Sequence, residues 1–143
     1  MTLADRARAT GTVIERFRDK PFAWDTTGNC IHLSHKQAKA LKVKVPTVPK
    51  FRTPLGARKA LKKMGFDTLE GLMDSMFPRI APARMIVGDI GMVPGEAPFN
   101  ALVVSVGGGK VVGWHGADLS RLQNIALSKA DFVAAWAVGR LPL

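Results

Sequence analysis

Apolar residues recur at helical spacing through the first half of the chain, between short stretches of turn-forming residues. This pattern predicts helices at about residues 3–19, 30–42, 55–64 and 67–77. Asn29 is the expected N-cap of the second helix, and Asp67 and Glu70 have the spacing of a capping box at the start of the fourth. The segment 45–54 contains three prolines, so we expect it to be an extended loop.

The pattern changes after about residue 80 to short runs of β-branched residues, which predict strands. The expected strands are residues 83–93, interrupted by Gly88, and residues 100–106, 110–115 and 121–127. Gly107, Gly108 and Gly109 join the second and third of these as a hairpin turn, since a phosphate-binding loop would need a following Lys-Ser/Thr pair and a helix. A single helical turn is expected at residues 128–132, whereas residues 133–139 fit either a strand or a helix.

Helices followed by antiparallel strands are typical of α+β proteins, in which the helices pack on one face of a small sheet. The 143 residues suit one domain, with an N-terminal helix in residues 1–20, a helical half in 21–80 and an antiparallel β half in 81–143. A hydrophobic content of 47% is ample for a packed core and excludes general disorder. We expect the tryptophans in the core or at its edge, namely Trp24, Trp114 and Trp136.

The chain is strongly basic, with a formal net charge of +10, and the excess is concentrated in one segment. No acidic residue occurs between Asp25 and Asp67. The ten basic residues of this interval are Lys36, Lys39, Lys42, Lys44, Lys50, Arg52, Arg58, Lys59, Lys62 and Lys63. Such a patch favours nucleic acid, an acidic protein surface or an anionic cell-wall polymer, although a solvated face that keeps the protein soluble has the same pattern. Nucleic acid is the least favoured partner, because Phe51 is the only aromatic residue in the patch.

Other classes are excluded by what the sequence lacks. One cysteine rules out an internal disulfide and a Cys-cluster metal or iron–sulfur site, and we expect no cofactor and no metal. No run of residues approaches the ~18 to 20 apolar residues of a membrane span, and the N-terminus lacks the apolar segment of a signal peptide. We therefore expect the chain to fold in a cytoplasm.

Cys30 carries the clearest candidate chemistry. Its place at a predicted helix start favours the thiolate, because backbone N–H groups and the helix dipole stabilise negative charge there. A cysteine nucleophile also needs a base, and His32 and His35 lie on other sides of the same helix, so we expect them to be surface or boundary residues. That leaves His115, at the end of the hairpin. The alternative is that Cys30 packs as a small buried hydrophobic residue.

Several stretches resemble the NlpC-type cell-wall peptidases, which have a papain-like fold. "PFAWDTTGNC" at residues 21–30 resembles the segment that leads to their nucleophile, "VGDI" the start of their first strand, and "NALVVSVGGGKVVGWH" at residues 100–115 their hairpin. Residues 119–140 are closer to an uncharacterised branch encoded among the tail-tip genes of tailed bacteriophages. The resemblance implies that Cys30 stands at the nucleophile position and that Trp24 lines the cleft beside it.

The match is incomplete at the position of the base. The catalytic histidine of the peptidases opens the strand that here begins with Asn100 and Ala101, and neither residue can take a proton from a thiol. His115 lies slightly after the position of the third polar group of the peptidase site. A positioned general base is worth roughly 10²- to 10⁴-fold, so we expect the site to be degenerate.

Two functions remain open at this point. In the first, the chain is a structural component of a phage tail tip or hub, made in the host cytoplasm and carried in the virion, with its basic segment against other, acidic tail proteins. In the second, it is a thiol peptidase or amidase that opens peptidoglycan during genome delivery. Cys30 would then attack, His115 would be the base, and Asn100 would orient it or line the oxyanion site. The missing base favours the first function.

Overall fold

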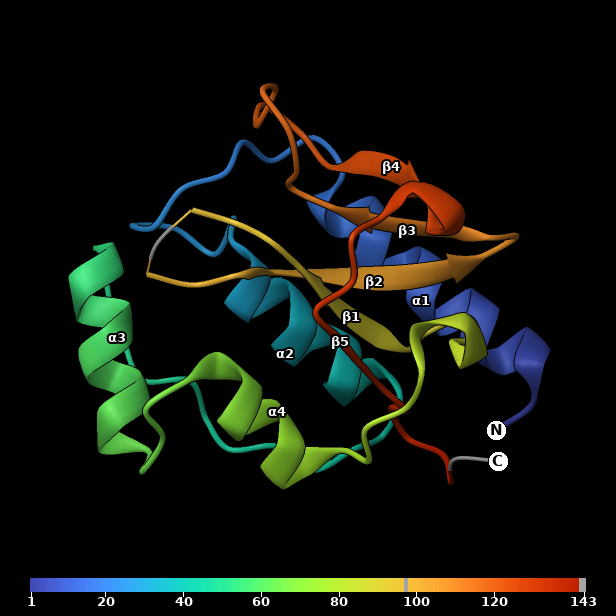
Figure 1. Ribbon diagram of the computed structural model, residues 1–143, viewed down its shortest axis with the longest axis horizontal. Coiled ribbons are helices and arrows are strands. Elements are labelled where there is room, and N and C mark those ends of the chain that lie inside the picture. Colours follow the sequence, from blue (N-terminus) through green and yellow to red (C-terminus); the bar gives the residue numbers. More distant parts are fainter. Residues whose placement is uncertain (97, 142–143) are drawn as a thin grey trace.

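The chain folds as four α-helices followed by a five-stranded sheet (Figure 1). The computed structural model describes residues 1–96 and 98–141. The helices are α1 (Leu3–Phe17), α2 (Cys30–Ala40), α3 (Pro54–Lys63) and α4 (Leu69–Met76). The strands are β1 (Ile90–Val93), β2 (Ala101–Gly107), β3 (Lys110–Gly113), β4 (Gln123–Ala126) and β5 (Ala134–Trp136). Within the described residues, no helix has the length and apolar character needed to cross a bilayer.

The sheet has the order β4-β3-β2-β1-β5, and each neighbouring pair is antiparallel. The last strand therefore crosses from the β4 edge to the opposite edge, where it pairs with β1. The β2–β3 hairpin turns through Gly107, Gly108 and Gly109, which all have positive φ, a conformation that glycine adopts without strain. The predicted α+β class and the hairpin are both confirmed.

The helix starts depend on side-chain caps, and one of these differs from the prediction. Asn29 caps α2, as expected. The capping box expected at Asp67 and Glu70 is wrong. Thr68 is the N-cap of α4, and its Oγ1 accepts a hydrogen bond from the N–H of Gly71 at 3.0 Å. The threonine hydroxyl takes the position that the sequence pattern assigned to the aspartate one residue earlier.

The strands also differ in extent from the prediction. The strand expected at residues 83–93 forms only over β1, because the chain first makes a 3₁₀ turn at Pro82–Arg84 and then passes through Gly88 with φ +97°. Residues 133–139, for which two structures were open, contain β5. The single helical turn expected before them is a 3₁₀ turn at Leu127–Lys129.

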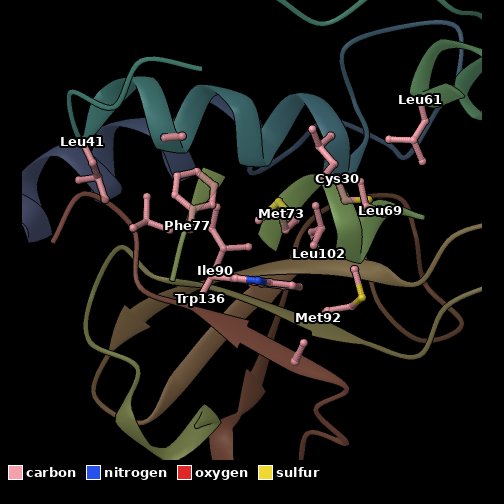
Figure 2. Close-up of a cluster of buried hydrophobic side chains, with 14 residues drawn as sticks. Cys30, Leu41, Leu61, Leu69, Met73, Phe77, Ile90, Met92, Leu102 and Trp136 are labelled. Atoms are coloured by element: carbon pink, nitrogen blue, oxygen red, sulfur yellow. The ribbon is translucent and has the colours of Figure 1, made fainter. Parts of the chain in front are cut away.

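Helices cover one face of the sheet, with α1 and α2 against β2 and α4 against β5, while α3 lies to one side (Figure 1). Figure 2 shows the largest core cluster, in which Leu41 and Met73 from the helices face Ile90, Leu102 and Trp136 from the sheet. The opposite face carries a smaller cluster, covered by the segment around the second 3₁₀ turn and made of Val93, Val103 and Val111. Because both faces are buried there, the interior strand β1 is buried along its whole length, whereas the edge strand β4 alternates between half-buried and exposed residues.

Asp89 is fully buried and is held by two arginines. Its Oδ1 accepts a hydrogen bond from Arg6 Nη2 at 3.0 Å, and its Oδ2 accepts one from Arg140 Nη2 at 2.7 Å. The backbone N–H groups of Ile86 and Val138 donate to the same carboxylate. The aspartate of "VGDI" thus joins α1, the start of β1 and the C-terminal segment. We call these side chains, Asp89, Arg6 and Arg140, the Asp89 clasp.

Candidate functional site

A cleft of about 540 Å³ opens where β1 ends and β2 begins, and the candidate residues share it. Its walls come from the segment before α2, the first residues of α2 and α3, the β1–β2 connection and the segment after β3. Cys30, Asn100 and His115 all line this cleft. The fold therefore brings together the three candidate residues, which are far apart in the sequence.

Cys30 lies on the floor of the cleft with its side chain turned into the core. It is only 6% exposed, and Figure 2 shows it at the start of α2, beside Leu69 and above Leu102. Burial raises the pKa of the Cys30 thiol above its ordinary value of 9.0, and hydrogen bonds from the backbone of Leu102 and of the helix start offset this only in part. At neutral pH this helix start therefore holds a thiol and not a thiolate.

Among the described residues, the groups that act on the Cys30 thiol are backbone groups and the apolar core, and none of them is a base. Asn100 and Ala101 line the cleft where the resemblance places a histidine, and neither can accept the proton. His115 is exposed at the rim of the cleft. In the part of the chain that the structure describes, burial and backbone groups shift the Cys30 pKa, and no histidine acts on it. The three candidates therefore share one cavity.

One wall of the cleft is aromatic. Trp24 packs against Phe22 and Phe99, with ring centroids 5.4 Å and 6.0 Å away. Phe22 also meets Trp114 edge-on at 6.1 Å, and the Nε1 of Trp114 donates to the carbonyl of Lys20 at 2.9 Å. Trp114 is buried, as expected, whereas Trp24 is half-buried and faces the cleft. Rings packed edge to face hold one another in place, so this wall is a preformed apolar surface.

The family model described as "Domain of unknown function (DUF6950)" matches residues 1–138. The chain belongs to this family. Among curated proteins, none matches the chain in sequence.

Comparison with solved structures identifies the fold. NlpC2 and NlpC1 from Trichomonas vaginalis superpose with TM-scores of 0.60 and 0.58, each at 14% sequence identity. The match covers 94% of this chain, but 47% of NlpC2 and 44% of NlpC1, so the chain spans about half the length of either protein. The likeness shows an NlpC-like fold, which confirms the fold expected from the sequence motifs.

His32 and His35 fasten the proline-rich loop to α2, a role that sequence analysis missed. His35 Nε2 lies 3.0 Å from the carbonyl oxygen of Pro46. His32 Nδ1 lies 3.0 Å from Oδ1 of Asn29, and its ring packs against Phe51 at 5.3 Å. Their spacing on the helix did not indicate these partners. His35 contacts a backbone carbonyl and His32 packs against a ring, and neither interaction leaves a recognisable pattern in the sequence. Among the described residues, no group of three His, Cys, Asp or Glu side chains could hold a metal ion.

We expect the protein to lose stability as the pH falls from about 7 to about 5, because of His32 and His35. Burial lowers the pKa of both side chains below their ordinary value of 6.5. In this pH range the unfolded chain therefore binds more protons than the folded chain. Stability that is present above pH 6.5 is lost as the pH falls through the lowered values. Thermal denaturation followed by circular dichroism measures the loss.

Variants separate these two histidines from the other titrating groups. A double variant, His32→Gln with His35→Gln, should flatten the pH profile in this range, whereas the exposed His115→Gln should leave it unchanged. Asp74, whose pKa is lowered below 3.8 by hydrogen bonds from Arg79 and Trp136, titrates outside the range. An unchanged profile in the double variant would show that the loop contacts do not control stability.

All ten basic residues between Asp25 and Asp67 are exposed. They follow the outer side of α2, the proline-rich loop and the outer side of α3, and the ion pairs of the described residues are formed by other side chains. Phe51, the aromatic residue among them, is packed between His32 and Trp24. It is therefore not free to stack on a nucleic-acid base.

Proposed function

We propose that this chain is a non-hydrolytic NlpC-type domain that binds a partner, and that it serves as an assembly component of a bacteriophage tail tip or hub. The state of Cys30 carries the first part. Its thiol lies in the core with a raised pKa, and no base is paired with it in the described residues. The thiolate is the nucleophile and a positioned base adds roughly 10²- to 10⁴-fold, so the site is poorly suited to amide hydrolysis. The preformed aromatic wall suits the cleft to binding.

The tail-tip role is supported by the resemblance of residues 119–140 to the phage branch, together with a cationic surface that complements acidic neighbouring proteins. In this role the chain is made in the host cytoplasm and carried in the virion. Mass spectrometry of purified virions from a phage that encodes this sequence should detect the chain at a fixed ratio to the tail proteins. Detection in the infected-cell lysate without detection in the tails would exclude the role.

The absence of hydrolysis is tested with purified peptidoglycan. We expect the wild-type protein and a Cys30→Ala variant to release soluble muropeptides at the same background rate, measured by chromatography of the supernatant. An active NlpC-type peptidase serves as the positive control. Release by the wild-type protein that Cys30→Ala abolishes would overturn the proposal.

A thiol peptidase or amidase acting on peptidoglycan is the second candidate, and one observation favours it. Cys30, Asn100 and His115 line the same cleft, so a movement of the rim that carries His115 across the cavity would bring its ring to the thiol. In that case His115 takes the thiol proton and the cationic surface holds anionic wall polymer. Hydrolysis would then require both side chains, and His115→Ala would abolish it together with Cys30→Ala.

A further inference from the structure

Two helices begin at the cleft. Cys30 is the first residue of α2 and Pro54 is the first residue of α3, and both line the cavity. Neither helix has an acidic residue in its first turn. The partial positive charge at the N-terminal end of each helix is therefore not neutralised locally, and both ends lie at the same hollow. This raises the electrostatic potential inside a cavity whose wall is aromatic.

The cleft is bordered at Pro54 by α3, which carries exposed cations. Lys50 and Arg52 precede α3, and the helix itself presents four exposed cations, namely Arg58, Lys59, Lys62 and Lys63. Acidic side chains also lie at this cleft, since Glu96 is one of its lining residues and Asp25 and Asp118 adjoin the lining residues Trp24 and Leu119 in the chain. On the α3 side positive charge dominates, and any ligand that leaves the cleft in that direction meets an array of cations.

The lining of the cleft itself is suited to an apolar group of a ligand. Besides the four aromatic rings already described, the lining includes Leu119, which is 40% exposed at the rim. Leu55, 61% exposed, stands in the first turn of α3 next to Pro54. Together with the aromatic wall, these leucines extend the apolar surface at the mouth of the cleft, and contiguous exposed apolar surface marks interaction sites.

We infer that the cleft and α3 together bind an acidic polypeptide segment, with an aromatic or aliphatic side chain seated against Trp24 and carboxylates lying along α3. The inference rests on the proposed binding function and names the partner's chemistry. A polypeptide supplies both parts of this site, whereas an anionic wall polymer supplies charge without an apolar anchor. The site also explains why the cations are exposed and lie outside the ion pairs of the described residues.

The probes are two fluorescein-labelled peptide pools. The first has the form Asp-Glu-Asp-X-X-Asp-Glu-Asp, where X is Leu, Ile, Val or Phe, and the second replaces every Asp and Glu by Asn and Gln. Fluorescence anisotropy at about 150 mM salt should show binding of the acidic pool at least about tenfold tighter than of the neutral pool. The tryptophan emission of the protein should also change on binding, because Trp24 lines the cleft and the peptides contain no tryptophan.

Matched variants distinguish a site from general charge attraction. Trp24→Leu and the double variant Lys59→Glu with Lys62→Glu should each weaken binding at least about tenfold. The double variant Lys110→Glu with Lys129→Glu makes the same change of charge at two exposed positions outside the cleft lining and should leave binding unchanged. Circular dichroism checks that each variant is folded, and the change in tryptophan emission of the wild-type protein tests the cleft independently if Trp24→Leu unfolds.

Defined results would overturn the inference. These are no binding of the acidic pool, acidic binding that is indifferent to Trp24→Leu and leaves the emission unchanged, or equal competition by a single-stranded oligonucleotide or by soluble muropeptides. The peptidoglycan assay is separate from this one. Muropeptide release that depends on Cys30 would overturn the proposed function, whereas failure of peptide binding without hydrolysis would overturn only the acidic-partner inference.

Discussion

Replacing Asp89 by alanine is expected to lower the free energy of unfolding by about 3–5 kcal/mol, because the change leaves a buried arginine without its counter-charge. Arg6 is 3% exposed and donates to Asp89 at 3.0 Å. The backbone N–H groups of Ile86 and Val138 lose the same acceptor. Urea denaturation followed by circular dichroism measures the difference, and we expect the variant to be largely unfolded at temperatures that the wild-type protein tolerates.

An exposed ion pair provides the control. Glu15 pairs with Arg18 at 3.1 Å on the surface of α1, with both side chains largely in solvent. Glu15→Ala should cost less than about 1 kcal/mol. Asp89→Asn keeps a side-chain oxygen that can accept part of these hydrogen bonds. Its loss in the free energy of unfolding should lie between those of Asp89→Ala and Glu15→Ala. A loss in Asp89→Ala no larger than that in Glu15→Ala would show that the clasp does not hold the fold together.

The native thiol of Cys30 is expected to react with Ellman's reagent at least about tenfold more slowly than the same thiol in urea, because a buried thiol is both less ionised and less accessible to the reagent. Burial raises the pKa of Cys30 and the core covers its side chain. Both effects slow attack on the reagent. The rate is followed near pH 8 by the absorbance of the released thionitrobenzoate.

A surface thiol calibrates the measurement. Ser128 is exposed in the 3₁₀ turn at Leu127–Lys129, so Ser128→Cys in a Cys30→Ala background should react at the same rate with and without urea. Faster labelling of Cys30 in the native protein than in urea would mean that the cleft activates the thiolate. That result would favour the peptidase hypothesis over the binding function.

Local patterns in the sequence predicted most of the fold. Helical spacing located α1 to α4, and the glycines after β2 located the hairpin, because these signals depend on neighbours a few residues apart. The prediction was undecided at β5, where a short apolar run has no period of its own and pairing with β1 determines the structure. It was wrong over the first half of residues 83–93, where the conformation of Gly88 follows from its packing against α1 and α2.

The candidate site divides in the same way. The sequence placed Cys30 at a helix start and indicated that the base was missing, since both follow from residue type and position. It could not show whether the thiol ionises, because that depends on Leu69 and Leu102, which come from a distant helix and a distant strand. The partners of His35 and of Asp89 could not be predicted from the sequence either, because these contacts depend on tertiary structure and not on local spacing.

The Asp89 clasp also determines where the chain can be attached to something else. Arg6 donates to the carbonyl of Val138 at 2.7 Å, so the first turns of α1 and the C-terminal segment lie side by side, on the side of the molecule away from α3 (Figure 1). A tether fused at either end would leave from this side and keep the cleft open to solvent. A mechanical pull between the two ends would act on the Asp89 clasp, through Arg6 on one side and Arg140 on the other.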